Sequence, residues 1–127
     1  MMALALMLLG LLLAGCNPDP TIHMHKAQNA FAGQQYGPAL DEYNKVLELE
    51  PESRTALLGK GRSLYELKRY QEALDAFEKF LKLTEPERAA YRNERFDAEF
   101  YRDKCKQAMG EEVPQNPRNI PPPPMGE

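Results

Sequence analysis

The stretch from Tyr36 to Leu49, YGPALDEYNKVLEL, recurs later in the chain as the stretch from Tyr70 to Leu83, YQEALDAFEKFLKL. Aligning residues 20–53 with residues 54–87, so that Tyr36 meets Tyr70, gives nine identical pairs, where unrelated segments of ordinary composition would give about two. The pairs are Thr21/Thr55, Lys26/Lys60, Tyr36/Tyr70, Ala39/Ala73, Leu40/Leu74, Asp41/Asp75, Lys45/Lys79, Leu47/Leu81 and Leu49/Leu83. An internal period of about 34 residues is typical of arrays built from helix pairs.

The repeated stretch resembles the second helix of the tetratricopeptide repeat family. That family's pattern, an alanine with an aromatic residue four positions on, occurs at Ala39 and Tyr43 and again at Ala73 and Phe77. The prolines that follow are Pro51 and Pro86, and the small residues of the first helices are Ala27 and Gly61. The family's tryptophan and tyrosine in the first helix are absent. The resemblance covers roughly residues 20–86 and implies stacked pairs of antiparallel helices.

The spacing of apolar residues gives a physical reason for the same fold. Tyr36 and Tyr43 lie two helical turns apart on one face, and Leu40 and Leu47 complete the apolar stripe. Each helix pair leaves an apolar flank that the next pair must cover. The sequence therefore predicts an all-α, tetratricopeptide-like array of two helix pairs and a C-terminal capping helix. The predicted domain spans residues 21–109, with repeats at about 20–53 and 54–87 and the capping helix at about 86–109.

The beginning of the chain has a different character. Residues 1–15 are almost entirely apolar, too few for a comfortable membrane span but of the length of a signal-peptide core. The sequence from Leu13 to Cys16, LAGC, resembles the bacterial lipoprotein box, although no Lys or Arg precedes the apolar run. The alternative is a buried helix that ends in an ordinary cysteine.

The lipoprotein resemblance has consequences for location. It implies a signal peptide at residues 1–15, a diacylglyceryl group and palmitate on Cys16, and a short lipid-anchored linker at residues 16–20. Because Asn17, rather than an aspartate, follows the cysteine, we expect the protein in the bacterial cell envelope, on the outer membrane facing the periplasm. Several acyl chains would make such an anchor effectively permanent.

The histidine and cysteine side chains are the candidates for a metal site or a disulfide. His23 and His25 are two positions apart, so they point to different faces of a helix, and the sequence predicts no metal site there. Cys105 lies in the predicted capping helix and, with Cys16 lipidated, is left without a partner in the chain. We expect a half-buried, inert thiol, with an intermolecular disulfide as the alternative.

The C-terminal segment, residues 110–127, is rich in proline and poor in apolar residues that could form a core. It is expected to be disordered, with the run from Pro121 to Pro124 in polyproline II conformation. It serves either as a tether or as a docking peptide.

The composition of the chain argues against several classes of function. The formal charge is −3, and the 16 basic residues are interleaved with 19 acidic ones, so no basic block indicates nucleic-acid binding. No phosphate-binding loop, zinc spacing or nucleophile–base set is present, so no cofactor and no enzymatic activity are predicted. The sequence favours a lipid-anchored interaction module or scaffold for another envelope protein, such as an assembly factor. The alternative is a self-associating structural subunit of the envelope.

The family resemblance implies where a partner would bind. In tetratricopeptide arrays the first helix of each pair lines a concave groove. The residues here that would line it are Met24, Gln28, Phe31, Leu58, Arg62, Tyr65, Arg69, Arg92 and Phe96. This mixture of aromatics and arginines suits an extended segment with some acidic character. The alternative is that Phe31 and Tyr65 merely pack between helices.

Overall fold

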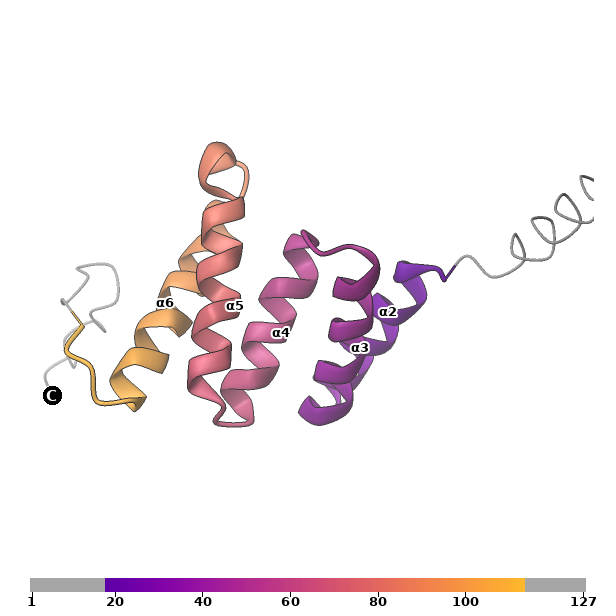
Figure 1. Ribbon diagram of the computed structural model, residues 1–127, viewed down its shortest axis with the longest axis horizontal. Coiled ribbons are helices and arrows are strands. Elements are labelled where there is room, and N and C mark those ends of the chain that lie inside the picture. The colour runs from indigo at the N-terminus through magenta and orange to yellow at the C-terminus, as the bar shows by residue number, and fades with distance from the viewer. Residues whose placement is uncertain (1–17, 114–127) are drawn as a thin grey trace, which may run out of the picture.

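The computed structural model describes residues 18–113, and this part of the chain is helical without strands. The α-helices are α2 (Pro20–Ala32), α3 (Tyr36–Leu49), α4 (Arg54–Glu66), α5 (Tyr70–Leu83) and α6 (Arg92–Ala108), and a short 3-10 helix, η1 (Glu85–Glu87), precedes α6. They lie side by side in chain order along the long axis (Figure 1). The predicted all-α repeat array is therefore confirmed. The predicted signal peptide, Cys16 and residues 114–127 lie outside the described residues.

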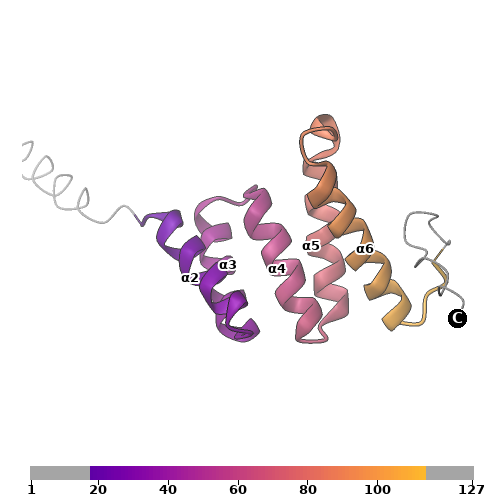
Figure 2. The ribbon, with the colours of Figure 1, turned by 180° about the vertical axis from the view of Figure 1, so that it is seen from behind.

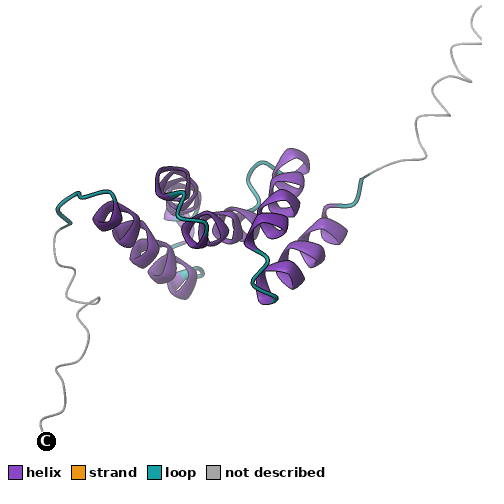
Figure 3. Cartoon of the chain, turned by 90° about the horizontal axis from the view of Figure 1, so that it is seen from below, coloured by secondary structure: helices purple, strands orange, loops and turns teal. Residues whose placement is uncertain are grey.

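The helices form two layers. α2 packs against α3, and α4 packs against α5, and the starts of the corresponding helices are separated by the internal period of the sequence. α2 and α6 lie behind α3 and α5 in Figure 1 and in front of them when the array is seen from behind in Figure 2. The view from below shows the resulting zigzag of helix axes (Figure 3). The array therefore alternates first and second helices, as a stack of helix pairs requires.

The core explains why alanine and glycine occupy particular positions. Ala39 and Ala73, the alanines of the repeated pattern, are completely buried. On α4, a Cβ atom added to Gly59 would lie 2.2 Å from the ring of Tyr43 on α3, and one added to Gly61 would lie 2.7 Å from the ring of Phe77 on α5. α4 is thus held between two aromatic rings, and both contacts require glycine.

Burial is uneven along the array. α2 buries only the side chain of Ala27, whereas α5 buries six residues, among them Phe77 and Phe80. The larger apolar cluster joins α4, α5 and α6 with Leu40 of α3, and the smaller one lies between α2, α3 and the start of α4. α2 is consequently the helix that contributes least to the core.

Three helices end in the same backbone motif. At the end of α4, Lys68 N–H donates to the Tyr65 carbonyl at 2.9 Å and Arg69 N–H donates to the Leu64 carbonyl at 2.9 Å. This pair of bonds is the Schellman motif, which places Lys68 in the left-handed conformation at φ 60°. Equivalent bonds end α2 around Gln34, at φ 59°, and α6 around Gly110, at φ 83°. Only the last of these uses glycine.

Replacing Lys68 with glycine should therefore stabilise the protein. A left-handed conformation costs a non-glycine residue about 1–2 kcal/mol, partly offset by the greater unfolded-state entropy of glycine, so Lys68→Gly should raise the free energy of unfolding by about 0.5–1 kcal/mol. Urea denaturation followed by circular dichroism measures the change. The matched control is Lys60→Gly inside α4, which should lose about 1 kcal/mol. A loss of stability in both variants would contradict the role assigned to the turn.

The capping helix begins later than the sequence predicted. Instead of one helix over residues 86–109, the chain forms η1, a turn over residues 88–91, and then α6 from Arg92. The first helices of successive units begin at positions 20, 54 and 92, so the second step is longer than the first by about one helical turn. This later start accompanies a tertiary contact. The additional residues allow Arg95 of α6 to reach the carbonyl of Leu81 near the C-terminal end of α5.

Candidate functional site

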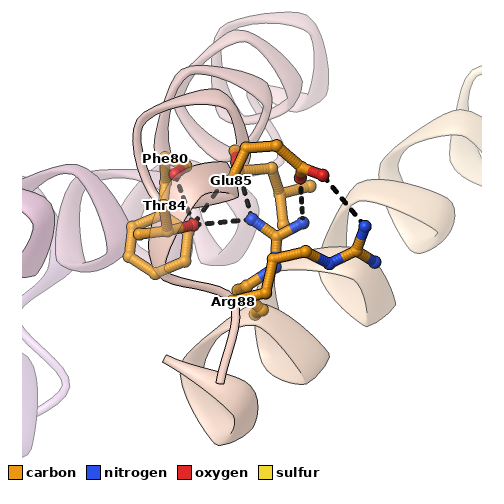
Figure 4. Close-up of polar contacts among 6 residues, drawn as sticks. Phe80, Thr84, Glu85 and Arg88 are labelled. Carbon is orange, nitrogen blue, oxygen red and sulfur yellow. Dashed lines mark hydrogen bonds and ion pairs between the residues drawn. The ribbon is translucent and has the colours of Figure 1, made fainter. Parts of the chain in front are cut away.

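Arg95 fixes the position of α6. It is 7% exposed, and its Nη1 donates to the carbonyl of Leu81 at 2.7 Å and to Oγ1 of Thr84 at 2.8 Å, while its Nη2 donates to Glu85 at 2.8 Å. Arg88 donates to the other oxygen of the Glu85 carboxylate at 2.9 Å, and Figure 4 shows Thr84, Glu85 and Arg88 around this network of contacts. A cation here satisfies carbonyls that the end of α5 leaves without helical partners. The cluster is a structural clamp, and no local pattern in the sequence indicates it.

The arginine and tyrosine predicted for the groove on α4 are engaged with α6. Arg62 forms an ion pair with Asp97, and its guanidinium carbon lies 5.8 Å from the ring centre of Tyr101. Tyr65 makes edge contacts with the rings of Tyr70, at 5.7 Å between centroids, and Tyr101, at 5.0 Å. A partner that used Arg62 would have to compete with Asp97, a carboxylate that was not among the predicted site residues.

Two other predicted residues share a depression at the α2 end. Met24 and Gln28 line a hollow of about 320 Å³ together with residues from α3 and α4. The other lining residues are Pro20, Thr21, His25, Val46, Glu50 and Thr55. Gln28 is exposed and Met24 half-buried, so this hollow offers both polar and apolar contacts.

The remaining predicted residues are dispersed. Phe31 packs edge-on against Tyr36, with 5.3 Å between ring centroids, and Leu58 is half-buried against the larger apolar cluster. Arg69 is exposed and paired with Glu72 at 2.6 Å. Arg92 and Phe96 line a separate, wider depression on α6 of about 740 Å³, so the structure distributes the nine residues over several surfaces.

The ion pairs near α2 join the first helix pair. Nδ1 of His23 lies 2.6 Å from Oε2 of Glu42, and Lys45 donates to the other oxygen at 2.7 Å. The hydrogen bond from Lys45, followed by that from His23, lowers the pKa of the Glu42 carboxyl group. His25 points elsewhere and lines the α2 hollow, so the two histidines do not converge.

Cys105 is more deeply buried than predicted. It has no exposed surface and belongs to the cluster that joins α4, α5 and α6. The expected half-buried position was wrong because the apolar side of α6 turns fully into this cluster. Burial raises the pKa of the Cys105 thiol to about 11, so it stays protonated and poorly nucleophilic near neutral pH. An intermolecular disulfide through Cys105 would require local opening.

Neither a metal cluster nor a membrane-spanning helix is found within residues 18–113. In this range no three His, Cys, Asp or Glu residues lie together in a way that could hold a metal ion. None of the helices in the same range is long and apolar enough to cross a membrane.

Comparison with known proteins bears on the helix pairs. Residues 25–87 match the family model described as tetratricopeptide repeat, a segment that runs from within α2 to the end of η1. No curated protein and no solved structure matches the chain. The family match and the paired, stacked helices together show that residues 25–87 are similar to tetratricopeptide repeats in sequence and in helix arrangement.

Proposed function

We propose that this protein is a lipid-anchored module that binds another protein of the bacterial cell envelope, on the outer membrane facing the periplasm. The main support for protein binding is the repeat segment at residues 25–87, because tetratricopeptide repeats generally bind other proteins or peptide segments. The LAGC sequence that ends at Cys16 supports the lipid anchor. A role as an assembly factor for an envelope complex is consistent with both features.

The hollow at the α2 end favours an extended partner segment. Met24 supplies an apolar contact, and Gln28 supplies a polar group that can bond to a backbone. Arg69 lies in the turn between α4 and α5, where it is exposed and paired with Glu72. An extended segment with an acidic residue could use these contacts without disturbing Arg62 and Tyr65.

Site-specific photo-crosslinking tests the groove. A p-benzoylphenylalanine residue in place of Gln28 should form an adduct with one envelope protein in cells that make the full chain. The same residue in place of Asp41, which is exposed on α3, should not form that adduct. Adducts only between copies of this chain would favour a self-associating structural subunit, and equal yields from both positions would contradict a groove site.

The anchor is tested separately. Cys16→Ser should abolish incorporation of an alkyne-labelled palmitate, because it removes the proposed acylation site. Cys105→Ser should keep the label, since Cys105 is buried in the folded protein. The labelling readout also distinguishes acylation from simple retention of the apolar segment in membranes. Label that persists in the Cys16→Ser protein would contradict the lipoprotein assignment.

A further inference from the structure

α6 has the features of the first helix of a third pair. It packs on α5, as α4 packs on α3, and it lies in the layer that contains α2. It also ends in the same Schellman motif as α2 and α4, whereas α3 and α5 do not show these bonds. Each of the two earlier first helices is covered by a second helix. Within residues 18–113, α6 has no such cover.

The arrangement of α4 shows which side of α6 is left uncovered. On α4, Gly59 faces the preceding helix α3, and Gly61, two positions later, faces the following helix α5. Two positions correspond to about 200° around a helix, so these residues lie on nearly opposite sides. On α6, Ala98 and Cys105 have no exposed surface, and both belong to the apolar cluster shared with α4 and α5. Phe96 and Phe100 lie two positions to either side of Ala98, so they point away from this cluster, to the side where a following helix would lie.

This side carries a row of residues four positions apart: Arg92, Phe96, Phe100 and Lys104. We call these four residues the α6 row. Phe96 is 42% exposed, the highest value among the large aromatic side chains of residues 18–113. Nζ of Lys104 lies 5.6 Å from the ring centre of Phe100, and Arg92 lines the depression of about 740 Å³ beside Phe96. Two aromatic rings are thus flanked by a cation at each end.

The α6 row carries two positive charges, on Arg92 and Lys104, because the nearby acids Asp97 and Asp103 are paired with other cations. Asp97 is paired with Arg62, and Asp103 with Arg102. Arg92 and Lys104 take part in none of the ion pairs found within residues 18–113. The nearby acids Glu94 and Glu99 are also in none of these ion pairs, and Glu99 lines the same depression as Phe96. A binding partner would therefore be favoured if it placed carboxylates near Arg92 and Lys104.

We propose that the α6 row docks an amphipathic helix of the envelope partner, and that this helix completes the third pair. The partner helix would carry apolar residues three or four positions apart over Phe96 and Phe100, with acidic residues at both ends. This inference rests on the proposed protein-binding function but uses the α6 depression that Arg92 and Phe96 line, which is separate from the hollow at Met24 and Gln28. The sequence from 114 to 127 is a poor substitute for this helix, because prolines at 114, 117 and 121–124 would interrupt a helical run.

Photo-crosslinking followed by peptide mapping tests this occupant. The two probe positions are Phe96, about one helical turn before Phe100, and Gln107, about two turns after it on the same side. With p-benzoylphenylalanine at either position, adducts should form with one partner protein. The attachment points from the two positions should lie about three helical turns apart, on one face of a segment flanked by Asp or Glu. The control position is Lys79 on α5, which is exposed and should give no such adduct.

The mapped segment, as a synthetic peptide, then tests charge complementarity with the purified full chain. Arg92→Glu with Lys104→Glu should weaken binding by about tenfold or more. Lys79→Glu, a charge reversal elsewhere, should leave the dissociation constant within about twofold.

Other results overturn the proposal. Adducts with a second copy of this chain, adducts with residues 114–127, or no adduct from Phe96 and Gln107 would each do so. Adducts from Gln28 without any from Phe96 would leave the groove function intact and reject the docked helix. Absence of adducts from all three positions would reject both.

Discussion

Phe77→Ala should lower the free energy of unfolding by about 3–5 kcal/mol, the largest loss expected from one substitution in this chain. The Phe77 ring has no exposed surface. It covers Gly61 on α4 and stacks on Tyr101 of α6, with 5.7 Å between centroids and 11° between planes. Removing it leaves a cavity where three helices meet. Urea denaturation followed by circular dichroism measures the loss.

The matched control is the same substitution at Phe96, which is 42% exposed on α6. Phe96→Ala should change the free energy of unfolding by no more than about 0.5 kcal/mol. Similar losses in the two variants would show that α6 is not packed as the structure has it. The control also separates stability from binding, because the α6 row uses Phe96 only when a partner helix is present.

Arg95→Met should cost about 2–3 kcal/mol, the second large effect, because buried acceptors that lose their donors carry a desolvation penalty. The methionine keeps much of the apolar volume but removes the donors to the Leu81 carbonyl and to Thr84 Oγ1. The favourable charge at the end of α5 is lost as well. Thermal and urea denaturation of the variant measure this loss.

Arg88→Met provides the comparison, since Arg88 contacts the same Glu85 carboxylate from the solvent side. A single exposed ion pair is worth little, so this variant should stay within about 0.5 kcal/mol of the unaltered protein. Arg95→Lys should retain part of the stability, because lysine keeps the charge but not the planar fork. Equal effects at positions 88 and 95 would contradict the clamp.

The fold was predictable because its determinants are local and repeated. The internal period, the alanines at 39 and 73 and the apolar stripes all follow from short-range spacing. The start of α6 was not predictable in this way. It depends on the contact between Arg95 and the carbonyl of Leu81, 14 positions away, and the sequence presents Arg95 as one more charge on a polar helix.

The site was harder to predict than the fold for a similar reason. Arg62 and Tyr65 were chosen from their positions in a first helix, and the structure shows both in contact with α6. The partner of Arg62 is Asp97, 35 positions later, and neither residue carries a local signal of this pairing. The α6 row, in contrast, is visible in the sequence as a spacing of four. The sequence does not show that this side of α6 is uncovered, because it does not show which side of the helix faces α5.

The uneven burial along the array has a mechanical consequence. A stack of repeats holds together through contacts between neighbours, so its ends open first. α2 buries only Ala27, whereas α5 buries six residues and α6 buries four, so the N-terminal end opens more easily than the C-terminal end. A pulling force applied through the N-terminus would peel α2 away before the α4–α6 core yields. The unravelled α2 would then add length to the chain while α4, α5 and α6 stay folded.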